Sequence, residues 1–193
     1  MANDCWNRVE ITGDSNTLIK LKERFDSLEN GFLTTNTYPS MFEGNTSGTQ
    51  RDFTDVDWGS KRLDCSTYEL ENGKITFAGD SAWAPPLEFY QLLSEDWDVT
   101  IDVKYDERGM DFAGHAVFES GDLEVDEEWT YWENLYLNDK EQFNEEILEH
   151  AGWCETFDEV IENLSIDNWK TQTDFNPEDF REMFDNYRDE NPW

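Results

Sequence analysis

The stretch YELENGKITF, residues 68–77, decides the fold. Apolar and polar residues alternate on both sides of Asn72-Gly73. Alternation with period two is typical of a strand with one buried face, and Asn-Gly between two such runs favours a two-residue turn with positive φ angles. The stretch therefore predicts a β-hairpin.

Further elements flank the hairpin on both sides. The pattern predicts a strand over residues 7–13, a helix carrying Leu18, Leu21, Phe25 and Leu28, a helix opened by Pro85-Pro86, a strand over residues 99–105, a turn at Arg108-Gly109 and a strand over residues 114–118. Residues 31–57, rich in Thr, Ser, Asn and Gly, are expected to form a long surface loop. The order β-α-β-β-α-β-β is the split arrangement of ferredoxin-like folds with one extra strand. We therefore expect an α+β domain over residues 1–120, with an antiparallel sheet under two helices.

After Gly121 the composition changes. A further strand is expected around Trp129, Tyr131 and Trp132, followed by three short helices: one that ends near Gly152, one opened by a capping box from Thr156 to Glu159, and one opened by Asn176-Pro177. Residues 121–193 are thus expected to form an acidic, mainly helical extension. It should pack on the first domain through the apolar faces of its helices, that is, through Phe157, Val160, Ile161, Phe180 and Phe184.

The charge of the chain is extreme. Its 193 residues include 46 Asp and Glu but only 14 Lys and Arg, which gives a formal net charge of −32. Small soluble domains usually carry a net charge of magnitude about 2 to 8. Nine Trp, thirteen Phe and seven Tyr nevertheless indicate a folded core rather than an acidic disordered chain. Residues 121–193 hold 23 acids and 4 bases, so most of the excess lies in the extension.

The acids of the extension recur at helical spacing. Glu141, Glu145 and Glu149 lie four residues apart, which is about 6 Å along a helix, whereas duplex DNA carries one charge per about 1.7 Å. Two or three such rows on neighbouring elements would approach the charge density of a duplex. The candidate partner-binding acids are Glu124, Asp126, Glu127, Glu128, Glu141, Glu145, Glu146, Glu149, Glu155, Asp158, Glu159, Glu162, Glu178, Asp179 and Glu182.

The acidic composition is also compatible with two different roles for the charge. The chain could be an acidic adaptor that binds another protein through an aromatic patch made of Trp129, Tyr131 and Trp132. Adaptation to concentrated salt would also produce an acid-rich chain, although it should spread acids evenly along the sequence.

Residues for catalysis are scarce. The chain has two histidines, His115 and His150, and its three cysteines are scattered without a CxxC pair. It lacks the G-x-S-x-G, G-x-G-x-x-G and phosphate-loop patterns, and it has no basic cluster. We expect no enzymatic activity, no cofactor, no metal and no direct binding of nucleic acid. The absence of a signal sequence or membrane span predicts a cytoplasmic protein.

Four segments resemble the phage- and plasmid-borne Api92-like family, whose members carry a ferredoxin-like domain of the YubB type. They are CWNRVEITG at residues 5–13, WGSK at 58–61, FAGDSAWAPP at 77–86 and YDERGMDFAGHAVF at 105–118. The resemblance covers about residues 1–120 and implies the fold and a mobile-element origin in a bacterial host, but no reaction and no functional residues. Together with the acidic rows it gives our hypothesis, a DNA-mimic inhibitor of a host DNA-acting defence enzyme of the restriction or CRISPR type.

Overall fold

The computed structural model describes residues 4–27, 63–169, 171 and 173–190. It divides the chain into two compact units, residues 1–128 and 129–193. The predicted loop over residues 31–57 lies outside the described residues. We expected the boundary between the two parts after residue 120, but it lies after Glu128. The reason is that a strand that begins at Asp122 joins the sheet of the first unit.

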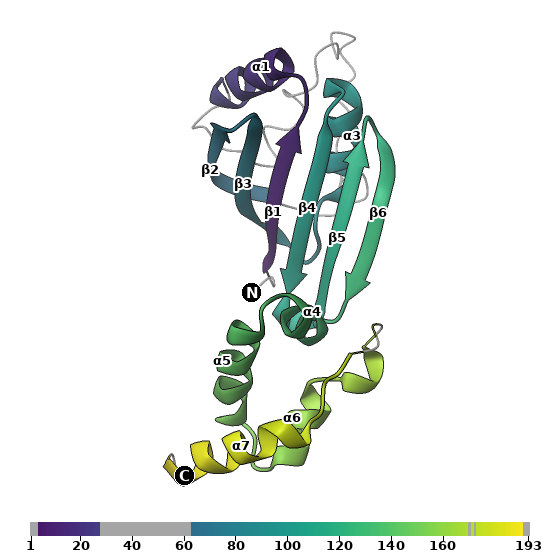
Figure 1. The fold of residues 1–193 in the computed structure, drawn as a ribbon. Coiled ribbons are helices and arrows are strands. Elements are labelled where there is room, and N and C mark those ends of the chain that lie inside the picture. The colour runs from purple at the N-terminus through teal and green to yellow at the C-terminus, as the bar shows by residue number, and fades with distance from the viewer. Residues whose placement is uncertain (1–3, 28–62, 170, 172, 191–193) are drawn as a thin grey trace. The chain divides into compact units, whose positions relative to one another are not determined.

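The first unit is an α+β domain with an antiparallel sheet, as predicted, but the sheet has six strands where five were expected (Figure 1). Its elements are β1 (Asp4–Thr12), α1 (Ser15–Asp26), β2 (Leu63–Glu71), β3 (Lys74–Ala82), α3 (Leu87–Trp97), β4 (Thr100–Glu107), a 3-10 turn (Arg108–Met110), β5 (Phe112–Glu119) and β6 (Asp122–Trp129). The strand order is β2-β3-β1-β4-β5-β6. Strands β1 to β4 have the ferredoxin-like order, and β5 and β6 extend the sheet beyond β4.

Two tight turns set the strand register. In the predicted hairpin, Asn72 and Gly73 have φ angles of 52° and 77°, and β2 pairs with β3 across them. Between β5 and β6, Ser120 and Gly121 have φ angles of 50° and 93°. Positive φ at both turn residues matches the right-handed twist of the two strands, so a two-residue connection suffices in each case.

Helices α1 and α3 of the first unit pack on one face of the sheet. The side chain of Asp14 caps α1 by accepting hydrogen bonds from the backbone N–H groups of Asn16 and Thr17. Alternate residues of the strands point to this face and meet the helices in one core. The core includes Val9, Ile11, Leu18, Leu21, Phe25, Ile75, Phe77, Phe89, Tyr90, Leu93, Ile101 and Val103.

The opposite face of the sheet is exposed and carries both signs of charge. Trp6 is 41% exposed on this face. Lys74 Nζ lies 2.8 Å from Glu10 Oε2, and this hydrogen bond holds the pKa of Glu10 below its usual range. His115 Nε2 lies 3.1 Å from Asp102 Oδ1, so this histidine is part of a polar cross-strand pair.

In its described residues, the second unit has four α-helices and a 3-10 turn (Ile166–Asn168) around an aromatic core. The α-helices are α4 (Tyr131–Asn138), α5 (Lys140–Ala151), α6 (Phe157–Asn163) and α7 (Glu178–Glu190). The residues that we expected to pack on the first domain, Phe157, Val160, Ile161, Phe180 and Phe184, belong to this core instead. Amphipathic helices can bury their apolar sides against one another, so these side chains need no sheet to cover them. Within the described part of the chain, every helix is too short or too polar to span a bilayer.

The prediction of a strand around residues 129–132 is wrong for Tyr131 and Trp132, which lie in a helix. The strand ends at Trp129, and Tyr131 and Trp132 form the first turn of α4. Thr130 caps this helix, since its side chain accepts a hydrogen bond of 3.1 Å from the backbone N–H of Glu133. The sequence from Thr130 to Glu133 has the S/T-x-x-E pattern of a helix start, which is the signal that was missed.

The capping box of α6 gives a first testable prediction. Thr156 Oγ1 accepts a hydrogen bond from the Glu159 N–H, and the Glu159 carboxylate accepts hydrogen bonds from the N–H groups of Thr156 and Glu155. We expect Thr156→Ala to lower the free energy of unfolding by about 1 kcal/mol, measured by urea titration. Thr156→Ser should retain most of this stability. An equal loss in both variants would show that the hydroxyl does not cap the helix.

Candidate functional site

The acidic row of α5 lies on the exposed side of that helix. Glu141, Glu145 and Glu149 are exposed, whereas Phe143 and Ile147 of the same helix are buried. Spacing of four residues places these glutamates along one side of the helix. The predicted row is therefore presented to solvent.

Helix α6 presents a second group of acids. Asp158, Glu159 and Glu162 are exposed on the side of the helix away from the buried Phe157, and Glu155 is exposed directly before the helix. Glu159 also serves the capping box, so part of its hydrogen-bonding capacity is used within the chain. The structure thus brings together on this helix the acids predicted to share one side.

Helix α7 carries a third group, part of which is paired. Arg181 Nε donates a hydrogen bond of 2.7 Å to Glu178 Oε2, and this bond lowers the pKa of Glu178. Asn176 Nδ2 donates a hydrogen bond of 2.9 Å to Asp179 Oδ1. Glu182 is exposed. The acids of α7 therefore differ in how freely they could contact a partner.

The predicted acids of β6 do not form one surface. Successive residues of a strand point to opposite faces. Glu127 lies on the open face, where its Oε2 is 3.5 Å from His115 Nδ1, while Glu124, Asp126 and Glu128 point to the other side. These four acids belong to the first unit, whereas the acids of the helices belong to the second. The candidate surface is thus divided between two bodies.

The proposed aromatic patch is not a surface. Tyr131 and Trp132 are buried in the core of the second unit, and Trp129 is half-buried. The Tyr131 hydroxyl donates a hydrogen bond of 2.8 Å to Glu146, and the ring of Trp132 packs 6.2 Å from that of Phe143, centroid to centroid. Tyr131 and Trp132 belong to the core of the second unit, so the prediction that they form a binding surface with Trp129 is wrong. Glu146, in turn, is half-buried and engaged within the chain.

Bases of the second unit lie over aromatic rings. Lys140 Nζ is 4.5 Å from the centre of the Tyr136 ring, and Arg181 is 4.4 Å from the centre of the Phe157 ring. Such pairs gain energy because the face of an aromatic ring is electronegative. Residues 129–193 contain 18 acids and 4 bases, so these internal contacts leave a large negative excess.

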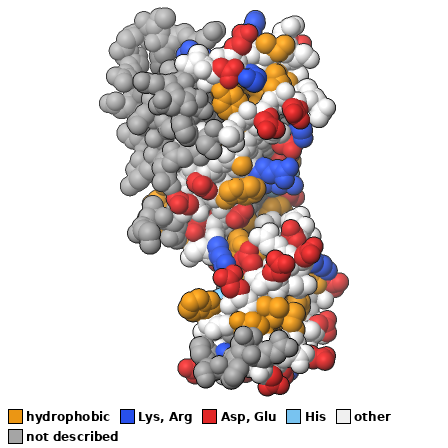
Figure 2. Space-filling view, turned by 90° about the vertical axis from the view of Figure 1, so that its left-hand side faces the viewer, with side chains coloured by type: hydrophobic (Ala, Val, Ile, Leu, Met, Phe, Trp, Pro, Cys, Tyr) orange, Lys and Arg blue, Asp and Glu red, His pale blue; other side chains and the backbone are white. Residues whose placement is uncertain are grey.

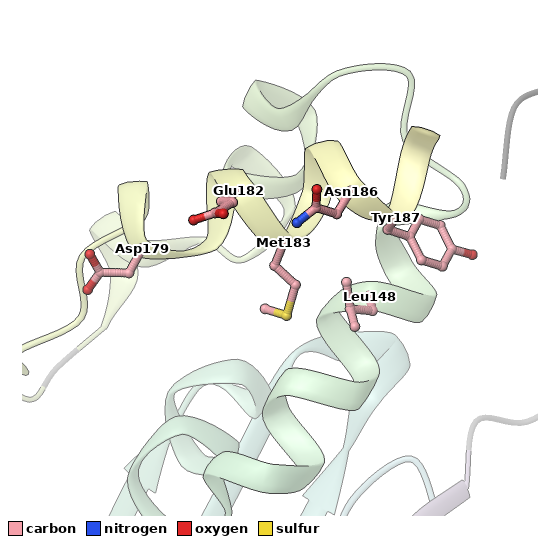
Figure 3. A pocket seen from close by; sticks show the side chains of 6 residues that line it. All are labelled: Leu148, Asp179, Glu182, Met183, Asn186 and Tyr187. Carbon is pink, nitrogen blue, oxygen red and sulfur yellow. The ribbon is translucent and has the colours of Figure 1, made fainter. Parts of the chain in front are cut away.

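Two grooves flank α7. The first lies between α5 and α7, has a volume of about 390 Å³, and is lined by Leu148, Asp179, Glu182, Met183, Asn186 and Tyr187. Figure 3 shows Met183 of α7 and Leu148 of α5 on facing sides of this groove. The second lies between α6 and α7 and has a volume of about 710 Å³. Neither groove could be predicted from the sequence, because each joins residues from different helices.

A third groove lies on the open face of the sheet. Trp6, Arg8, Glu10 and Lys74 contribute to its lining. Its bases face acids at short distance, so the groove has no dominant sign of charge. Figure 2 likewise shows Lys, Arg and apolar side chains among the acids on one face of the molecule.

One exposed aromatic residue also escaped prediction. Trp153 connects α5 with α6 and is 80% exposed, although Trp is usually among the more buried residues. The only sequence signal that Trp153 lies in a connection between helices is its position directly after Gly152, where a helix was expected to end.

The cysteines are free and buried. Burial raises the pKa of Cys5 to about 12 and that of Cys65 to about 11, and it also raises the pKa of Cys154. Thiols with such values are protonated at neutral pH and are poor nucleophiles. Among the described residues, no three His, Cys, Asp or Glu side chains come together in a way that could hold a metal ion.

The fold and surface define a class of protein, a ferredoxin-like α+β domain joined to an acidic helical unit. Residues 58–150 match the family model described as the ferredoxin-like domain in Api92-like protein, which confirms the resemblance to the Api92-like family. The match continues through α4 into α5, so it extends about 30 residues beyond the stretch recognised in the sequence.

Comparison with individual proteins adds little to this assignment. The chain is similar to a crystal structure of the protein Api92 from Yersinia pseudotuberculosis, with 19% identity and a TM-score of 0.33. The similarity covers 40% of this chain and 28% of that one. No curated protein matches the chain.

Proposed function

We propose that the chain is a non-catalytic binding protein of a mobile element that acts as a DNA mimic. Its acidic second unit would occupy the DNA-binding site of a host DNA-acting defence enzyme, such as a restriction or CRISPR nuclease, in the host cytoplasm. The partner is a nucleic-acid-binding protein or complex, and nucleic acid itself is not a ligand.

The observation that carries this proposal is the folded presentation of the acids. The second unit encloses its own aromatic core, and exposed acids occupy the outer sides of α5, α6 and α7. A folded body holds these charges at fixed positions, as the backbone of a duplex does. A disordered acidic tail would have to lose conformational entropy before it could match a shaped cleft.

Electrostatics favours a basic partner over other partners. Like charges four residues apart destabilise a helix by about 0.2–0.5 kcal/mol per pair. A basic partner would relieve this repulsion between the acids of the second unit. A cleft lined with Lys and Arg for phosphate binding would also attract the unit from a distance and speed the encounter.

The aromatic-patch adaptor has less support, since Tyr131 and Trp132 are buried. An adaptor would bind its partner without displacing DNA. The two functions are therefore separated by a competition experiment. Candidate nucleases recovered from a host lysate would be purified, loaded with a fluorescent duplex and titrated with this protein. Displacement of the duplex supports mimicry, whereas simultaneous binding with unchanged affinities contradicts it.

Salt dependence provides a second prediction. We expect the affinity for the partner to fall at least about 100-fold between 0.1 M and 1 M NaCl, because the Debye length falls from about 10 Å to about 3 Å. Fluorescence anisotropy or calorimetry across a salt series would measure it. A change below about threefold would indicate docking through apolar groups and would contradict an interface made of charges.

A further inference from the structure

The groove between α6 and α7 combines an apolar floor with an acidic rim. Phe157, Ile161, Ile166 and Pro177 provide apolar lining. The acids in its lining are Asp158, Glu162 and Glu178, and all three are exposed. An apolar surface bordered by carboxylates suits a ligand with an apolar stem and a cationic head.

One such group already lies in the groove. The guanidinium of Arg181 is 4.4 Å from the centre of the Phe157 ring and donates hydrogen bonds of 2.7 and 3.1 Å to Glu178. Its Nη2 atom is 3.9 Å from Asp158 Oδ1. Stacking on a ring together with a forked contact to a carboxylate is the binding mode that distinguishes arginine from lysine.

Arg181 does not neutralise the groove. Three carboxylates and one guanidinium line the groove, and the Arg181 side chain is 44% exposed. The groove therefore keeps an excess of negative charge and remains open to solvent beside Arg181. A second guanidinium could enter next to Glu162 and contact Ile161 and Ile166 with its stem.

We infer that this groove binds an arginine side chain of the partner protein. The inference rests on the proposed function, because DNA-binding sites present arginines to phosphates. Arg181 holds the place of the partner's arginine in the free protein, and it yields the Phe157 ring and the Glu178 carboxylate to that arginine when the partner binds. The groove thus adds a specific contact to an otherwise electrostatic interface.

The groove of Figure 3 is a useful contrast. It has acids in its lining, Asp179 and Glu182, but its lining contains no base that occupies it in the free protein. Binding driven by charge alone should involve both grooves equally. Binding that requires an aromatic ring and a carboxylate, as Phe157 and Glu178 provide, should favour the α6–α7 groove.

Peptide titration of the full chain tests the inference. Hexa-arginine and hexa-lysine peptides would be titrated into isotope-labelled protein and followed by NMR. We expect hexa-arginine to bind at least about threefold more tightly and to shift the amide signals of Phe157, Ile161 and Ile166 most strongly. Equal affinities, or shifts spread evenly over α5, α6 and α7, would overturn the assignment.

Variants sharpen the test. Glu162→Gln should weaken hexa-arginine binding about three- to fivefold, while Asp189→Asn, which removes one exposed charge from α7 outside the groove, should change it less than about twofold. Arg181→Gln should strengthen binding about two- to fivefold, because it removes the competing guanidinium from Phe157 and Glu178. Weaker binding by Arg181→Gln, or equal effects of Glu162→Gln and Asp189→Asn, would refute the site.

The peptide titration and the DNA competition assay can fail independently, so the arginine site and DNA mimicry are tested separately. If the peptide ignores the groove but the protein still displaces DNA from a nuclease, the inference fails and mimicry stands. If the peptide occupies the groove but the protein displaces no DNA from its partner, mimicry fails and the arginine site stands.

Discussion

Changing Glu145, Glu149, Asp158 and Glu162 together to Lys is expected to abolish displacement of DNA from the partner. These positions are exposed on α5 and α6, so each lysine replaces an attractive contact with a repulsive one. At about 1 kcal/mol per position, four changes weaken binding about a thousandfold. The measurement is a competition titration against a labelled duplex at constant ionic strength.

A matched variant distinguishes the effect of the acids' position on the protein from the effect of its net charge. Reversing Glu23, Glu69, Glu71 and Glu119 to Lys alters the net charge equally, but these exposed residues lie in the first unit. This variant should keep most of its affinity. Exposed substitutions usually change stability by less than about 0.5 kcal/mol each, so both variants should remain folded, as circular dichroism can verify. Equal losses would mean that net charge, rather than the second unit, determines binding.

The elements with strong local signals were predictable from the sequence. Asn72-Gly73 specified the hairpin, and the capping box at Thr156 specified the start of α6. Each signal depends on residues close together in the chain, where backbone conformation is set by local hydrogen bonds and φ preferences. Strand β6 was placed poorly because acids at its exposed edge conceal the alternation of Leu123 and Val125.

The candidate site was predictable only in part. Helical spacing placed Glu141 and Glu145 on an exposed side of α5, as the structure shows. Spacing could not indicate which acids are engaged within the chain, because those contacts join distant positions. Glu127 meets His115 on the neighbouring strand. The stacking of Arg181 on Phe157, across 24 residues of sequence, depends in the same way on tertiary packing.

Phe143→Ala is expected to unfold much of the second unit. Phe143 is fully buried, and four rings surround it at centroid distances of 5.4 to 6.2 Å, those of Trp132, Tyr136, Phe175 and Phe180. Truncation of such a ring costs about 3–5 kcal/mol, a large part of the stability of a unit of this size. Urea unfolding followed by NMR signals from each unit would measure the loss, and Phe143→Leu should cost considerably less.

The same variant tests whether mimicry needs an ordered surface. Phe143→Ala changes no charge, so every acid of the second unit remains in the chain. If fixed rows of carboxylates are what the partner recognises, affinity should fall together with the folded fraction of the second unit and recover in Phe143→Leu. If Phe143→Ala displaces DNA as well as the unchanged protein does, a disordered acidic chain is sufficient. The enclosed core would then have to serve a different purpose, and the DNA-like arrangement of charge would not be the basis of binding.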